Sequence, residues 1–178
     1  MTRQFDLPVS RDLVGDNAPS VLPGDDPAIL GHATLGPTDP VEVRTFQSFT
    51  LIYTVGSLGL DDTGGIRIAW RRIGDSGLMQ TQNPAAPNYV SAQSNGEGRL
   101  SLDYSRRGGQ RPWGEILTIT QHGGYLRPGE TITIRVGDRH GGNPGLLLQT
   151  VADAGRDFVV TAAVQATDTF YPLPQCHL

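Results

Sequence analysis

The segment Phe49-Thr50-Leu51-Ile52-Tyr53-Thr54-Val55 has the clearest pattern in the chain. Side chains of an extended strand alternate between its two faces. The first, third, fifth and seventh residues of this segment are therefore on one face, and all four are large and apolar. Two threonines lie among the three residues of the other face. This alternation predicts a strand that is buried on one side.

Strand patterns recur along the rest of the chain at intervals of roughly 12 to 20 residues, with Gly, Pro, Asn or Asp between them. No amphipathic helix of ordinary length interrupts the series. We therefore expect an all-β fold, an antiparallel β-sandwich of the immunoglobulin-like or jelly-roll-like kind. The further strands are expected at 66–71, 89–90, 100–104, 116–120, 131–136, 146–151 and 158–164.

The chain divides into three predicted parts. Residues 1–40 contain six prolines and six aspartates without a sustained period, which predicts an extended arm with room for a short edge strand. Residues 41–171 form the predicted sandwich domain, and residues 172–178 form a C-terminal tail. We expect the arm to contact a partner subunit or a second copy of the chain.

Composition narrows the classes of function. The 178 residues carry 37% hydrophobic and 18% charged side chains with a net charge of −4, which argues against nucleic-acid binding. All 14 basic residues are arginine, so Schiff-base and phosphate-loop lysines are excluded. The single cysteine, Cys176, excludes an internal disulfide and a multi-cysteine metal site. We expect no cofactor, no membrane contact and a cytoplasmic location.

The loop Gly137–Gly145 holds the most promising polar residues of the sequence. Asp138, Arg139 and His140 follow one another directly after a predicted strand. A carboxylate can orient an imidazole and arginine can bind an anion, so the three are candidates for catalysis, with Arg139 also a candidate for ligand binding. The alternative is a turn in which Asp138 bonds its own backbone while its two neighbours face water.

Other candidates are weaker. Asp61 is a further candidate catalytic residue, although Asp61–Gly65 has the composition of a tight turn rather than of a calcium loop. His122 and His140 lie on separate segments without metal-ligand spacing, so we expect no metal site. Arg111 and Trp113 are candidate ligand-binding residues, and Trp113 is alternatively a lid over the core.

Several segments together resemble a known family. They are Tyr53–Gly56, Asp61–Ala69, Asn83–Val90, Arg111–Gly114, Gly124–Thr133 and the loop Gly137–Gly145. In this order they are similar to the N-terminal β-sandwich region of large, poorly characterised bacterial proteins. Those proteins carry a metal-dependent hydrolase domain of the polymerase-and-histidinol-phosphatase type further along. The resemblance spans roughly residues 40–174 and does not include that domain, so it implies a sandwich, and the family's hydrolase activity cannot be carried over from it.

Three functions remain open. The leading hypothesis is a non-catalytic accessory or assembly module that binds a partner subunit or a small ligand. The second is a small hydrolase, lyase or isomerase, which requires the loops holding Asp61, Arg111 and Asp138–His140 to meet at one end of the sandwich. The third is a binder of carbohydrate or small anions through Arg111, Trp113 and Arg139. Catalytic spacing is not recognisable, so the balance favours binding.

Overall fold

The computed structural model describes residues 27–71, 75–109, 113–155, 157–165, 169–173 and 176–177. The elements are a one-turn helix, α2 (Pro27–Leu30), and twelve short strands in the described ranges. The strands are β1 (Gly31–Gly36), β2 (Phe46–Gln47), β3 (Phe49–Val55), β4 (Gly65–Trp70), β5 (Val90–Ser94), β6 (Arg99–Ser105), β7 (Glu115–His122), β8 (Thr131–Val136), β9 (Leu146–Leu147), β10 (Asp157–Ala163), β11 (Tyr171–Pro172) and β12 (Cys176–His177).

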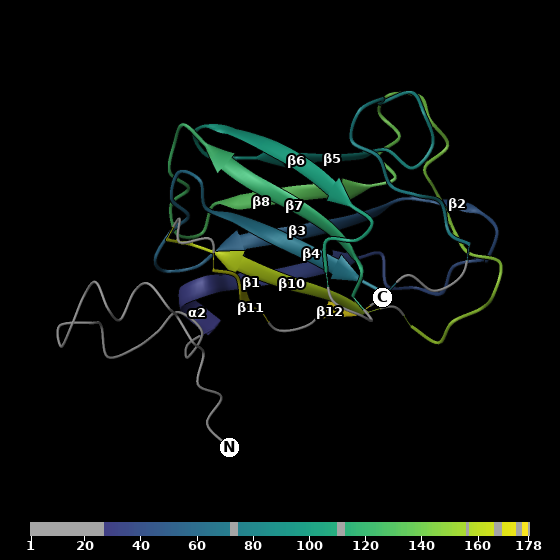
Figure 1. Cartoon of the computed structure of the whole chain (residues 1–178), viewed down its shortest axis with the longest axis horizontal. Coiled ribbons are helices and arrows are strands. Elements are labelled where there is room, and N and C mark those ends of the chain that lie inside the picture. The colour runs from purple at the N-terminus through teal and green to yellow at the C-terminus, as the bar shows by residue number, and fades with distance from the viewer. Residues whose placement is uncertain are drawn as a thin grey trace, which may run out of the picture.

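Two antiparallel sheets face each other, so the predicted all-β sandwich is confirmed (Figure 1). The first sheet has the order β1-β3-β8-β5, and the second has the order β11-β10-β4-β7-β6, with β12 also paired to β10. The short strands β2 and β9 form a separate ribbon beside them. The strands β3 and β8 have the bounds that the sequence pattern predicts.

The core lies between the two sheets and follows the period of two. Along β3 the residues Phe49, Leu51, Tyr53 and Val55 are buried, as expected from the alternation. Opposite them, Trp70 of β4 stacks in parallel on Tyr104 at 5.9 Å between ring centroids. Trp70 is therefore a core residue, as its register with two isoleucines predicts.

The predicted arm contributes to the sandwich. Within residues 27–40, α2 and β1 precede residue 37, and β1 pairs with β3 along its whole length from Gly31↔Val55 to Gly36↔Thr50. Gly31–Gly36 is thus an edge strand of the sandwich, of the kind for which the predicted arm left room. Leu30 is fully buried and anchors the start of this edge strand, which explains why a polar, proline-rich segment is held there. The arm residues 1–26 lie outside the described residues.

The C-terminal segments pack along β10. Residues of β11 and β12 pair with this strand, and Leu173 is buried and donates its backbone N–H to Val160 O at 2.9 Å. The strand expected at 146–151 ends after Leu147. The reason is that Thr150 turns toward Asp75, to which its backbone N–H and hydroxyl donate at 2.9 and 3.0 Å.

The register of the strands defines two ends of the sandwich. Phe49 of β3 lies opposite Val136 of β8, and Trp70 of β4 lies opposite Glu115 of β7. The segments that follow β4 and β8 and those that precede β3 and β7 are therefore at the same end, which we call the loop end. It is on the right in Figure 1.

Tyr53 joins the core to the edge strand and generates the first prediction. Its hydroxyl is buried and donates to Leu30 O at 2.5 Å, and burial raises the pKa of this phenol. We expect Tyr53→Phe to lower the free energy of unfolding by about 1 to 2 kcal/mol, because the carbonyl of Leu30 loses its buried donor. Urea unfolding followed by tryptophan fluorescence measures the change.

Tyr125→Phe is the matched control. The hydroxyl of Tyr125 also donates to a carbonyl, Leu58 O at 2.9 Å, but this pair is exposed to solvent. Water can replace the lost donor there, so the effect should be no more than a few tenths of a kcal/mol. Equal losses in the two variants would contradict a special role for the buried pair.

Candidate functional site

The loop that follows β8 is held by its neighbours rather than by its own strand. Gly137 has φ +72°, and a Cβ at this position would lie 2.4 Å from Leu146 N, so glycine is needed for the chain to turn. Asp138 then donates its backbone N–H to Tyr89 O at 2.9 Å. The loop is thus attached both to β9 and to the segment that precedes β5.

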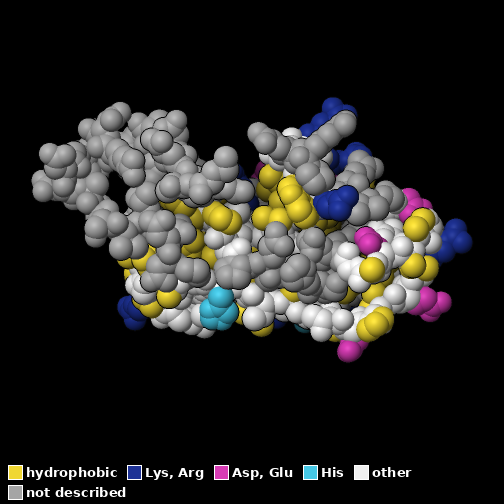
Figure 2. All heavy atoms as spheres, turned by 90° about the horizontal axis from the view of Figure 1, so that it is seen from below, with side chains coloured by type: hydrophobic (Ala, Val, Ile, Leu, Met, Phe, Trp, Pro, Cys, Tyr) yellow, Lys and Arg dark blue, Asp and Glu magenta, His cyan; other side chains and the backbone are white. Residues whose placement is uncertain are grey.

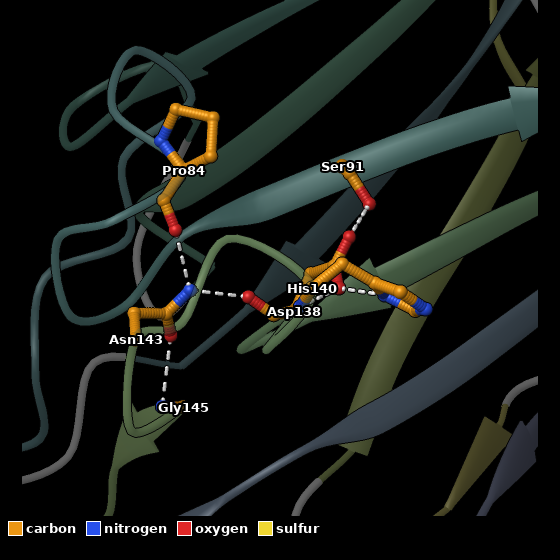
Figure 3. Close-up of polar contacts among 6 residues, drawn as sticks. All are labelled: Pro84, Ser91, Asp138, His140, Asn143 and Gly145. Atoms are coloured by element: carbon orange, nitrogen blue, oxygen red, sulfur yellow. Dashed lines mark hydrogen bonds and ion pairs between the residues drawn. The ribbon is translucent and has the colours of Figure 1, made fainter.

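The side chain of Asn143 holds this loop in place and is almost completely buried. Its side-chain amide donates to Pro84 O at 2.7 Å and to Asp138 O, while its Oδ1 accepts from Gly145 N at 2.8 Å (Figure 3). Gly141 lies against the same proline, because a Cβ there would be 2.2 Å from Pro84 O. Two loops far apart in the sequence therefore form one rigid unit.

Asp138 is buried at 6% exposure, and its carboxylate accepts three hydrogen bonds. One oxygen accepts from the hydroxyl of Ser91, across the sheet on β5. The other accepts from the backbone N–H of His140 at 3.0 Å and from His140 Nδ1 at 2.5 Å (Figure 3). Burial alone would raise the pKa of Asp138, but the bonds from Ser91 and His140 together hold it below its usual value.

His140 and Arg139 are exposed, as the turn interpretation expects. The ring of His140 is 80% exposed and is oriented through Nδ1, so its Nε2 points away from Asp138. Arg139 crosses to the short ribbon, where its Nη2 donates to Phe46 O at 2.6 Å. Both interpretations of the sequence thus hold in part: Asp138 does close its own turn, and it also orients the imidazole.

A polar hollow of about 410 Å³ opens beside these residues on the outer face of the first sheet. Ser48 and Thr50 from the start of β3 line it, together with Arg135 and the loop residues Asp138, Arg139 and His140. Arg135 is half-buried, and its guanidinium makes no hydrogen bond or ion pair with any residue in the described part of the chain. An arginine without an acidic partner beside a polar hollow is suited to bind an anion.

The arrangement does not form a hydrolytic relay. In such a relay a hydroxyl contacts the imidazole, which in turn contacts the carboxylate. Here the hydroxyl of Ser91 contacts the carboxylate of Asp138 directly, on the oxygen away from His140. Asp138 orients the imidazole of His140, and no hydroxyl among the described residues is hydrogen-bonded to that imidazole.

Asp61 lies at the opposite end of the sandwich, because it follows the end of β3 while Asp138 follows the end of β8, which runs antiparallel to β3. The two are separated by the length of a six-residue strand, about 20 Å. Asp61 is exposed and its carbonyl closes a turn with Gly64 N at 2.9 Å, while Asp62 accepts from Gly123 N. The loops required by the enzyme hypothesis therefore do not converge.

The remaining candidates are placed as follows. Trp113 precedes β7 at the loop end and is half-buried, while Arg111 lies outside the described residues. Within the described ranges, no three His, Cys, Asp or Glu side chains gather closely enough to hold a metal ion. No helix in the part of the chain that the structure describes is long and apolar enough to cross a membrane.

The sequence analysis missed Ser48, Thr50, Ser91, Arg135 and Asn143. Arg135 had a usable signal, because it stands on the polar face of a predicted strand three residues before Asp138. Ser91 and Ser48 had none, since their positions depend on which strands are neighbours. Asn143 lies among glycine and proline residues. In such a sequence, an asparagine that joins two loops cannot be distinguished from an ordinary turn residue.

No protein-family model and no curated protein matches the chain. Solved structures with a similar fold include a cohesin module from a Clostridium perfringens family 33 glycoside hydrolase, with 8% identity, TM-score 0.44 and coverage of 84% of this chain and 94% of that one. Another is the bacterial hydrophobin BslA, with 10% identity, TM-score 0.47 and coverage of 84% and 92%.

A third is the CBM3a-L domain of a Clostridium thermocellum scaffoldin, with 15% identity, TM-score 0.41 and coverage of 82% and 91%. With TM-scores below 0.5, these similarities say nothing about a ligand or an activity of this chain, and the sandwich assignment rests on its own strand pairing. The resemblance to the N-terminal region of hydrolase-bearing bacterial proteins stays a prediction.

Asn143→Asp tests the fastening of the two loops. The substitution keeps the size and the acceptor for Gly145, but replaces an amide that donates to two carbonyls by a carboxylate that repels them. We expect a loss of about 2 to 4 kcal/mol in the free energy of unfolding. Asn83→Asp is the control, because exposed Asn83 uses only its Oδ1, toward Ala85 N. Similar losses of unfolding free energy in both variants would contradict the role of Asn143 in joining the two loops.

Asp138→Asn tests the charge of the buried carboxylate. Its pKa is lowered in the folded protein, so its contribution to stability is complete above about pH 4, the usual value in an unfolded chain, and is lost as the pH falls through the folded-state value. The difference in unfolding free energy between wild type and variant should therefore be large at pH 7 and shrink toward pH 2. Urea unfolding at several pH values measures it.

Asp61→Asn provides the comparison for this pH series, because Asp61 is exposed. This variant should change the unfolding free energy at pH 7 by no more than about 0.5 kcal/mol, because substitutions of exposed side chains have small effects. A wild-type advantage over Asp138→Asn that stays constant from pH 7 to pH 2 would mean that the shape of the side chain matters and its charge does not.

Proposed function

We propose that the chain is a non-catalytic binding module that takes a carboxylate or phosphate group of a ligand or partner in the polar hollow. The observation that supports this most directly is the guanidinium of Arg135, which has no partner among the described residues and lies beside the exposed Arg139 and His140. Asp138, the one acid among the described lining residues of the hollow, is buried and already accepts from Ser91 and His140. The net field in the hollow therefore favours a negative group.

The loop that borders the hollow is held in place by hydrogen bonds within the protein. Asp138 and Asn143 immobilise the loop before a ligand arrives, so little conformational entropy is lost on binding. The outer face of the sheet continues from the hollow with Thr50, Thr54, Thr131 and Thr133, which are half-buried and can offer hydroxyls. A ligand with an acidic group and neighbouring hydroxyls, such as an acidic sugar, would meet both features.

The same surface could receive an acidic side chain of a partner subunit, which the accessory-module hypothesis requires. Both sources present the same chemistry to Arg135. Titrations with trigalacturonate, a glutamate-rich peptide and inorganic phosphate distinguish them, with maltotriose as the uncharged sugar. The amide signals of the loop after β8, followed by NMR, locate the binding.

Arg135→Gln should weaken the binding of the preferred anion about tenfold, because one charge-assisted hydrogen-bonded contact is removed. Arg99→Gln is the matched control, since Arg99 is an exposed strand arginine on β6 of the other sheet and the net charge changes equally. Binding should also weaken with added salt.

The proposal fails if none of the three anions binds, or if Arg99→Gln weakens binding as much as Arg135→Gln does. Recovery of trigalacturonate after prolonged incubation adds a check on the non-catalytic part. Cleavage of the sugar that disappears in His140→Ala would instead support the enzyme hypothesis.

A further inference from the structure

A second cavity lies on the other side of β3, between the sheets at the loop end. It has a volume of about 440 Å³, within the size range of small-molecule sites. Its apolar wall consists of Val41, Val43, Phe49, Leu146, Leu148 and Phe158. Phe49 belongs to the buried face of β3, whereas Ser48 and Thr50 of the polar hollow belong to the outer face, so the two cavities are separate sites.

The walls of this apolar cavity are held in place. Leu148 donates its backbone N–H to Thr45 O at 2.9 Å, and Arg44 donates to Gln149 O at 3.0 Å. Asp75 accepts twice from Thr150 and so fixes the start of the loop that continues to Gly155. Ala152, Ala154 and Gly155 complete the lining with small side chains, which leave the space open.

The charged groups among the described lining residues are both acidic. Asp39 and Asp153 belong to the two segments that border the cavity, and both are exposed. At the right-hand end of the molecule, where these segments lie in Figure 1, the surface seen in Figure 2 carries hydrophobic and acidic side chains together with arginines. An apolar cavity with an acidic rim is complementary to a molecule that joins an apolar body to a positive charge.

We propose that this cavity is a binding site for a small hydrophobic amine, whose apolar body contacts Phe49, Leu148 and Phe158 and whose ammonium group lies at the rim near Asp39 and Asp153. The site differs from the polar hollow in both ligand and location. It places a cation-binding pocket and an anion-binding hollow on opposite faces of the same strand.

Three compounds with the same rigid body and different charge test the proposal: 1-aminoadamantane, 1-adamantanol and adamantane-1-carboxylate. Calorimetry gives their affinities at pH 7. Trp70 reports on the cavity, because its ring lies 6.1 Å from that of Phe158, and Trp113→Phe leaves it as the only tryptophan. The amine should bind more tightly than the alcohol by about fivefold, and the carboxylate most weakly.

Two variants separate charge from shape. Asp39→Asn with Asp153→Asn should reduce the affinity for the amine to that for the alcohol, while the alcohol binds as before. Ala154→Phe fills the cavity and should abolish binding of both. Asp61→Asn, an acid at the other end of the sandwich, should change neither.

The proposal is overturned if no adamantane compound binds, if all three bind equally, or if the carboxylate binds best. The last result would direct attention to Arg156, which follows Gly155 in the sequence and lies outside the described residues. Binding that appears only after removal of residues 1–26 would show that the chain's own N-terminal segment is the occupant. In each of these cases the polar hollow and its anion remain a separate question, answered by Arg135→Gln.

Discussion

The antiparallel pairing of β3 with β8 is the constraint on which both candidate sites depend. It places Phe49 opposite Val136, so the start of one strand and the end of the other meet at the loop end. The alternation of side chains then sends Phe49 into the core and Thr50 to the outer face. One strand consequently contributes a wall to an apolar cavity and a wall to a polar hollow, and a slip of one residue would exchange the two.

The buried carboxylate of Asp138, in the loop after β8, is engaged in hydrogen bonds within the protein. A carboxylate that accepts three hydrogen bonds is stable as a buried charge, but it has little capacity left for a substrate. Among the residues that the structure describes, Arg135 beside it has a guanidinium without a hydrogen-bond or ion-pair partner. This distribution of hydrogen bonds is the reason why we propose anion binding rather than catalysis for the hollow.

Much of the fold could be predicted from local pattern, because each strand carries its own period of two. The bounds of β3 and β8 and the burial of Trp70 follow from single segments. The edge strand β1 has a weak pattern, since an edge strand is only partly covered. The prolines and aspartates around it predict an extended arm with room for a short edge strand, without placing that strand. The shortened β9 depends on Asp75, about 70 residues earlier, which no local pattern can reveal.

The candidate site was harder to predict because its members are brought together by strand order rather than by sequence. Asp138 and His140 are neighbours in the chain and were found, whereas Ser91 reaches Asp138 only because β5 pairs with β8. The same pairing argument separates Asp61, a weaker candidate in the sequence, from Asp138. Two facts are therefore needed before a polar residue beside a turn can be given a function. One is the end of the sandwich at which it lies, which follows from the strand register, and the other is whether its side chain is already hydrogen-bonded within the protein. By these criteria the proposed anion binding rests on Arg135, which lies within a strand, more than on the acid and imidazole of the loop.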